Sequence, residues 1–187
     1  PGRRGRKAHR EGKERLSTSE YRAEFERSIT GELNAGGQDA CQSYKDGVAA
    51  EQPTLATRVA SNKALIPLTE VLTDMISGSA DLEGSNKTKT PSTSEAIQAG
   101  TYAGRYINYG IREHGMAAAM NGMALHGGII PYSGLFMVFM DYCRPSVRLA
   151  ALMNVQSIYV ATHDSIGVGE DGPTHQPIEH LASLRAM

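Results

Sequence analysis

The feature that most limits the possible folds is a threefold alternation between short apolar segments and helix-forming segments. Each apolar segment has the length and composition of a buried strand, and each helical segment that follows is long enough to cross back over a sheet. The pairs are Tyr106–Gly110 with Arg112–Leu125, Gly128–Tyr132 with a helix containing Ser146–Met153, and Gln156–Ala161 with Ile178–Met187. Parallel strands need such crossover connections, so the pattern predicts an α/β fold: a parallel sheet with flanking helices, incomplete at the C-terminus.

A further strand and a long connection precede these units. Met75–Asp81 has the pattern of a short buried strand that ends in a polar turn, and helical spacing covers Thr57–Thr73. Proline lacks the backbone N–H of a helix interior, so Pro67 is expected to bend or divide that helix. Leu82–Thr101 is rich in Ser, Thr, Gly and Lys, and we expect a long loop there.

The N-terminal third has a different composition. Lys and Arg dominate residues 1–15, and helical spacing follows at Ser19–Thr30 and Gln38–Ala50. Aromatic residues that could stack on bases are not interleaved with these cations, so the sequence favours a solvated arm and no nucleic-acid partner. We expect residues 1–53 to form a basic, mostly helical or disordered linker arm, and residues 54–187 to form the α/β domain.

The predicted strand at Gln156–Ala161 leads into a loop dense with ionisable groups. This loop, Thr162–Pro177, holds two histidines and three carboxylates among glycines and prolines. Open α/β sheets bind ligands at the carboxyl ends of their strands, so the loop is the first candidate for a functional site.

Two further features could take part in chemistry. Glu113 lies where a strand gives way to a helix; the helix dipole alone would favour a carboxylate there, and a carboxylate facing a crevice could also share a proton with a ligand nitrogen. Phe136, Phe139 and Tyr142 recur every three residues. That spacing fits a helical core stripe, and it also fits a set of aromatic faces that holds a planar heterocycle.

Four residues have side chains suited to a phosphate group. Arginine offers a fork of donors, and histidine and hydroxyl groups add more; the candidates are Arg58, Ser85, His163 and His175. Spacing alone does not bring them together. The sequence has no metal-ligand motif of the common kinds, so we predict no metal site within these residues.

Three segments together resemble the transketolase family. They are Gly78–Leu82, Asn108–Met116 and the run Thr162–Pro177, in the family's order. The resemblance is to the middle domain, which holds the aminopyrimidine ring of thiamine diphosphate. It implies a pyrimidine-domain α/β fold and thiamine-diphosphate-dependent transfer of a two-carbon ketol unit from a ketose phosphate to an aldose phosphate.

The same resemblance implies a role for each candidate residue. Glu113 matches the catalytic glutamate that hydrogen-bonds the pyrimidine ring, and His175 matches a catalytic histidine near the reacting oxygens of the sugar. Cofactor contacts are implied for Phe136, Phe139, Tyr142 and Asp81. Sugar-phosphate contacts are implied for Arg58, Ser85 and His163, and a contact to a substrate hydroxyl for Asp171.

The resemblance also implies partners that these residues do not supply. Mg²⁺ and the cofactor's diphosphate are expected to bind to a separate domain, and a second subunit of a homodimer is expected to complete each active site. The chain by itself is therefore expected to be inactive. Two cysteines without a disulfide framework suit the cytoplasm, and no segment is typical of a membrane span. Two alternatives stay open: a sibling similar to dihydroxyacetone synthase, and a non-catalytic interaction module.

Overall fold

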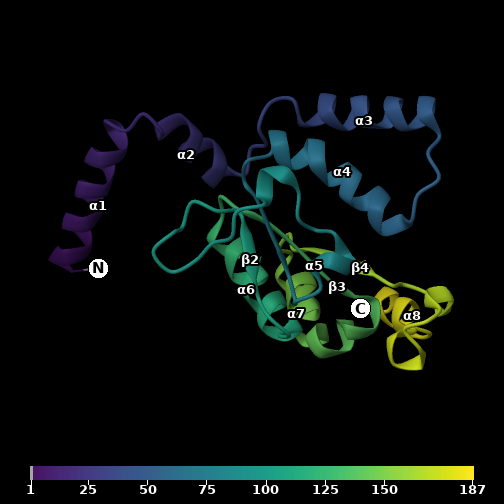
Figure 1. The fold of residues 1–187 in the computed structure, drawn as a ribbon. Coiled ribbons are helices and arrows are strands. Elements are labelled where there is room, and N and C mark those ends of the chain that lie inside the picture. Colours follow the sequence, from purple (N-terminus) through teal and green to yellow (C-terminus); the bar gives the residue numbers. More distant parts are fainter. Residues whose placement is uncertain (1) are drawn as a thin grey trace.

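The computed structural model describes residues 2–187 and contains a four-stranded parallel sheet (Figure 1). The strands are β1 (Met75–Ser79), β2 (Tyr106–Asn108), β3 (Ile130–Phe136) and β4 (Ile158–Thr162), in the order β2-β1-β3-β4. The register pairs Ser79 with Gly134 and Phe136 with Thr162, so the carboxyl ends of the strands lie along one edge. The predicted α/β fold with a parallel sheet is confirmed.

Eight α-helices accompany the sheet within the described residues. They are α1 (Arg3–Ser17), α2 (Arg22–Thr30), α3 (Gly37–Glu51), α4 (Thr57–Val71), α5 (Glu83–Asn86), α6 (Glu113–His126), α7 (Met140–Met153) and α8 (His180–Arg185). Pro67 lies inside α4, which continues as one helix and is not divided. None of the helices in residues 2–187 combines the length and apolar character needed to cross a membrane.

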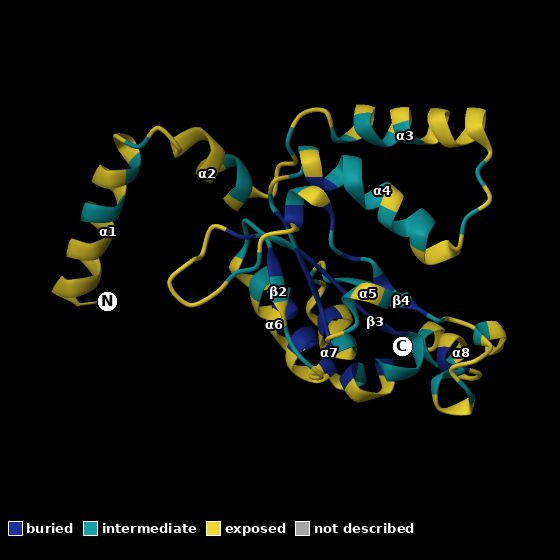
Figure 2. Ribbon diagram, in the orientation of Figure 1, coloured by how far each residue is buried: buried dark blue, intermediate teal, exposed yellow. Residues whose placement is uncertain are grey.

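The two faces of the sheet are covered differently (Figure 2). On one face α6 and α7 pack together over an apolar core, whose buried residues are Ala80, Met116, Ala117, Met120, Leu135, Met140 and Cys143. The buried residues of the segment that joins β1 to β2 are mostly polar, and hydrogen bonds tie them to the sheet. Ser77 Oγ donates to the carbonyl of Thr88 at 2.8 Å, and Thr88 Oγ1 donates to the carbonyl of Gly78 at 2.9 Å.

The expectation of a plain loop at Leu82–Thr101 is wrong. The segment contains α5 and a 3₁₀ turn at Pro91–Thr93, and Asn86, Thr88 and Thr93 are fully buried. Buried hydroxyl and amide groups are stable only when they are hydrogen-bonded, and here the sheet and α4 supply partners. Because those partners are distant in sequence, composition alone indicates an exposed loop.

The third strand begins and ends later than predicted. The sequence suggested Gly128–Tyr132, whereas β3 spans Ile130–Phe136. Phe136 therefore ends a strand, Phe139 lies in a 3₁₀ turn and Tyr142 lies in α7. The three aromatic residues consequently do not form a single helical stripe.

An ion pair joins the N-terminal helices to the sheet domain. Arg27 of α2 contacts both carboxylate oxygens of Asp74, at 2.7 and 2.8 Å, and both side chains are largely buried. The carboxylates of Glu24 and Asp74 raise the pKa of Arg27 above its ordinary value. Both contacts come from Arg27 Nη2, and charge-assisted hydrogen bonds of this kind are among the stronger polar contacts.

Asp74→Asn is expected to weaken this attachment. Loss of the charge partner should lower the free energy of unfolding by about 1–3 kcal/mol and increase hydrogen exchange in α2. Glu26→Gln is the matched control, because Glu26 pairs with Arg22 on the exposed surface and should change stability by less than about 1 kcal/mol. Equal effects of the two substitutions would contradict the prediction.

Candidate active site

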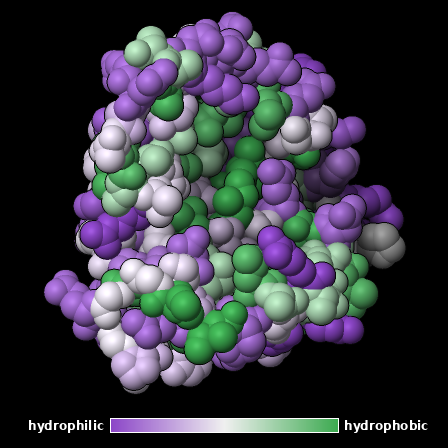
Figure 3. All heavy atoms as spheres, turned by 90° about the vertical axis from the view of Figure 1, so that its right-hand side faces the viewer, coloured by the Kyte–Doolittle hydropathy of each residue, from purple (hydrophilic) through white to green (hydrophobic). Residues whose placement is uncertain are grey.

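A cavity of about 480 Å³ opens at the carboxyl edge of the sheet, beside β3 and β4. It is lined by Ala56, Thr57, Arg58, Ser85, Phe136, His163, Asp164, Ser165, Gly167, Val168, Glu170 and Asp171. Arg58, Ser85, His163 and Asp171, which were expected to contact a sugar phosphate, therefore share one cavity. Figure 3 shows the face of the molecule that carries the Thr162–Pro177 loop. On this face, hydrophobic residues are flanked by hydrophilic ones.

His163 has contacts on several sides within this cavity. Its ring stacks on Phe136 with 3.8 Å between centroids, and its Nε2 lies 3.4 Å from Arg58 Nη1 and 3.7 Å from Asp171 Oδ2. His163 has a positive φ of 53°, which residues other than glycine rarely adopt, directly after the last residue of β4. The backbone thus turns the imidazole into the cavity at the end of the strand.

Burial lowers the pKa of His163 below its ordinary value, with the Asp171 carboxylate opposing this effect and the Arg58 cation adding to it. We expect an NMR titration midpoint below the ordinary value of about 6.5, which Arg58→Met raises and Asp171→Asn lowers. Since the folded-state pKa is depressed, the stability linked to His163 is present above about pH 6.5 and is lost as the pH falls through the folded-state value. A midpoint above the ordinary value would contradict this.

An aromatic cluster extends from the cavity towards α7. Phe136 and Phe139 are stacked with centroids 5.6 Å apart, and the His175 ring meets both edge-on, at 5.7 and 5.3 Å. Tyr142 lies 5.8 Å from Phe139 but is 66% exposed. The structure therefore brings His175 together with the aromatic residues and, through Phe136, with His163.

Glu113 is the first residue of α6, and it is only 7% exposed. Its carboxylate is close enough to Cys143 of α7 to affect that thiol: burial, with Glu113 as a further cause, raises the pKa of Cys143 to about 12. The Glu113 carboxylate is therefore buried near α7 and is not in bulk solvent. It does not line the cavity around His163.

Asp81 also lies outside the cavity lining. It follows β1 and is exposed, with a positive φ of 64°.

The lining includes residues that were given no role from the sequence alone: Thr57, Asp164, Ser165 and Glu170. Asp164, Ser165 and Glu170 belong to the Thr162–Pro177 run, so their position in that loop was a usable signal. Thr57 begins α4, whose free amide groups can attract an anion.

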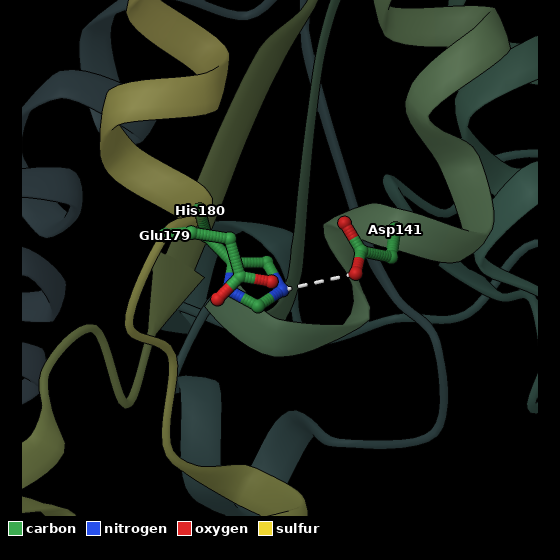
Figure 4. Close-up of side chains that lie close together, drawn as sticks. All are labelled: Asp141, Glu179 and His180. Atoms are coloured by element: carbon green, nitrogen blue, oxygen red, sulfur yellow. Dashed lines mark hydrogen bonds and ion pairs between the residues drawn. The ribbon is translucent and has the colours of Figure 1, made fainter.

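One group of side chains with the spacing of metal ligands occurs in residues 2–187, at Asp141, Glu179 and His180 (Figure 4). His180 Nε2 lies 3.1 Å from Asp141 Oδ2, and Glu179 Oε2 lies 3.9 Å from His180 Nδ1. Both carboxylates are exposed, and the contact joins α8 to α7. The prediction that these residues hold no metal stays a prediction.

Comparison with known proteins gives a consistent result. Residues 53–187 match the family model of the transketolase pyrimidine-binding domain. The chain is 55% identical over 184 residues to a transketolase of Cereibacter sphaeroides, covering 98% of the chain and 28% of that protein. It is 51% identical over 183 residues to one of Sinorhizobium medicae, covering 98% and 26% respectively.

Solved structures agree. Transketolase from Leishmania mexicana matches with a TM-score of 0.80 at 42% identity, over 94% of this chain and 25% of that one. Transketolase from Pichia stipitis, in complex with sedoheptulose-7-phosphate, matches with a TM-score of 0.79 at 41% identity, over 92% and 26%. The chain spans about a quarter of the length of these relatives. The chain belongs to the transketolase family and contains its pyrimidine-binding domain.

Proposed function

We propose that this chain supplies the pyrimidine-binding part of a transketolase that moves a two-carbon ketol unit from a ketose phosphate to an aldose phosphate. One observation supports this most strongly: Arg58, Ser85, His163 and Asp171, which lie far apart in sequence, line one cavity beside an aromatic cluster. We also propose the division into an arm at residues 1–53 and a domain at residues 54–187.

The cavity has the chemistry of a sugar-phosphate site. Arg58, Ser85 and His163 would bind the phosphate group, because all three can donate hydrogen bonds to its oxygens. Asp171 would accept a hydrogen bond from a sugar hydroxyl. His175, next to Phe136 and Phe139, would donate to the oxygens at the reacting end of the sugar.

We assign Glu113 and the aromatic residues to the pyrimidine ring of thiamine diphosphate. A carboxylate that is 7% exposed can hold or share a proton at a ring nitrogen, and Phe136, Phe139 and Tyr142 offer aromatic faces for the ring. Asp81 would lie near the cofactor. When bound, the cofactor supplies the carbon nucleophile and the electron sink for ketol transfer.

Other partners complete the proposal. Mg²⁺ and the diphosphate would be held by a further domain, and a second subunit would complete each site of a homodimer. We propose a cytoplasmic location, which the two free thiols, Cys41 and Cys143, support. On this proposal the 187-residue chain alone binds thiamine diphosphate weakly and has no ketol-transfer activity.

A hybrid enzyme tests the proposal. The matching 184 residues of the Cereibacter sphaeroides transketolase are replaced by this chain, and transfer to ribose 5-phosphate is assayed. Activity in the hybrid, with none in the isolated chain, is the expected result. A folded but inactive hybrid would favour the non-catalytic module, and a preference for formaldehyde as acceptor would favour the sibling similar to dihydroxyacetone synthase.

A further inference from the structure

A buried line of polar side chains connects β1 to the ring of His163. Ser79 Oγ lies 3.3 Å from Asn86 Oδ1, Asn86 Nδ2 lies 2.6 Å from Thr162 Oγ1, and Thr162 Oγ1 lies 2.9 Å from His163 Nδ1. Ser79, Asn86 and Thr162 are all buried, and Asn86 is fully so. Buried hydrogen bonds of this kind fix orientation, because an unmet donor or acceptor there is costly.

The direction of the hydrogen bonds follows from one backbone carbonyl. Asn86 Nδ2 lies 3.2 Å from the oxygen of Leu135, which can only accept, so the nitrogen end of the amide faces it. The same nitrogen therefore donates its second hydrogen to Thr162 Oγ1. The amide oxygen is left facing Ser79, whose hydroxyl can donate to it.

The Thr162 hydroxyl accepts this hydrogen bond from Asn86 and still has its single proton to donate. Among residues 2–187, the other side-chain group within hydrogen-bonding distance of its hydroxyl is His163 Nδ1. If the hydroxyl donates there, Nδ1 is the acceptor, and the proton of the neutral imidazole is on Nε2. Burial, which lowers the pKa of His163, favours that neutral ring at pH 7.

We propose that Asn86 and Thr162 are positioning residues that hold His163 as its Nε2–H tautomer. The ligand class rests on the proposed function: Nε2–H and Arg58 would donate side by side to the oxygens of a phosphate group. Two contacts of Nε2 act in opposite directions. The 3.4 Å contact with Arg58 Nη1 favours the opposite tautomer, because arginine can only donate, whereas Asp171 Oδ2, at 3.7 Å, favours Nε2–H, because a carboxylate can only accept.

The first test needs no variant. ¹⁵N-edited NMR of the 187-residue chain at about pH 8, above the ordinary histidine pKa of about 6.5, distinguishes a protonated from an unprotonated ring nitrogen. We expect a protonated Nε2 and an unprotonated Nδ1 in His163. A protonated Nδ1 in the wild-type chain would overturn the proposal.

Two substitutions of Thr162 form a matched pair. Thr162→Val keeps the shape but removes the hydroxyl, so the tautomers should mix and inorganic phosphate should bind about tenfold more weakly. Thr162→Ser keeps the hydroxyl and should preserve both properties. Asn86→Asp replaces the donor by an acceptor and should shift the population towards Nδ1–H.

The outcomes separate the two proposals. Unchanged tautomers in both Thr162→Val and Asn86→Asp would refute the positioning role, whatever the hybrid enzyme does. A wild-type chain with the expected tautomer but with no effect of phosphate on the His163 signals would refute the phosphate ligand. Ketol transfer in the hybrid is measured independently, so failure of the proposed function would appear there.

Discussion

Glu113→Gln in the hybrid enzyme is expected to lower kcat by about 10²–10⁴-fold, the usual contribution of a positioned acid or base. Glutamine has nearly the same shape but cannot exchange a proton with a ring nitrogen. Because Glu113 does not line the cavity around His163, the KM for sugar phosphates should change little. Steady-state kinetics with ribose 5-phosphate as acceptor measures both quantities.

Glu70→Gln is the control for this substitution, since Glu70 is an exposed residue of α4. It should leave kcat within about twofold of the wild type. Glu113→Gln should change the unfolding free energy by only about 1 kcal/mol, the usual size of a helix-dipole effect. If the Glu113→Gln hybrid kept a kcat within about tenfold of the wild type, Glu113 would not be a proton-transfer group of the reaction.

Gly134→Ala is expected to destabilise the fold by about 1–3 kcal/mol, the usual cost of overpacking. A methyl group at Gly134 would lie 2.6 Å from Asn86 Cβ and 2.8 Å from Thr88 Cγ2. Both neighbours are fully buried and hydrogen-bonded, so they cannot move aside without breaking other contacts. Urea-induced unfolding measures the loss.

Gly122→Ala provides the comparison. Gly122 is an exposed residue of α6, and nothing lies within 4 Å of an added methyl group. Alanine favours helix over glycine by up to about 1 kcal/mol, so this substitution should be neutral or stabilising. If the Gly134→Ala variant were as stable as Gly122→Ala, the close packing of Asn86 and Thr88 against Gly134 of β3 would not be needed for stability.

The site was only partly predictable from the chain. His163 and Asp171 belong to one dense loop after a strand, so the sequence places them together at the sheet edge. Arg58 and Ser85 were assigned as phosphate contacts through the family resemblance, and their convergence with that loop depends on how α4 and α5 lie against the sheet. Asn86 gave no signal, because its proposed positioning role depends on contacts with Leu135 and Thr162, far along the chain.

The parallel α/β fold and most of its helices follow from the amino-acid sequence, because they depend on the local alternation of apolar and polar residues. Three other features emerged only from the folded chain: the burial of the segment that joins β1 to β2, the continuation of β3 to Phe136, and the separation of Glu113 from the cavity around His163. They depend on hydrogen bonds and packing between residues that are distant in sequence, which no local pattern records.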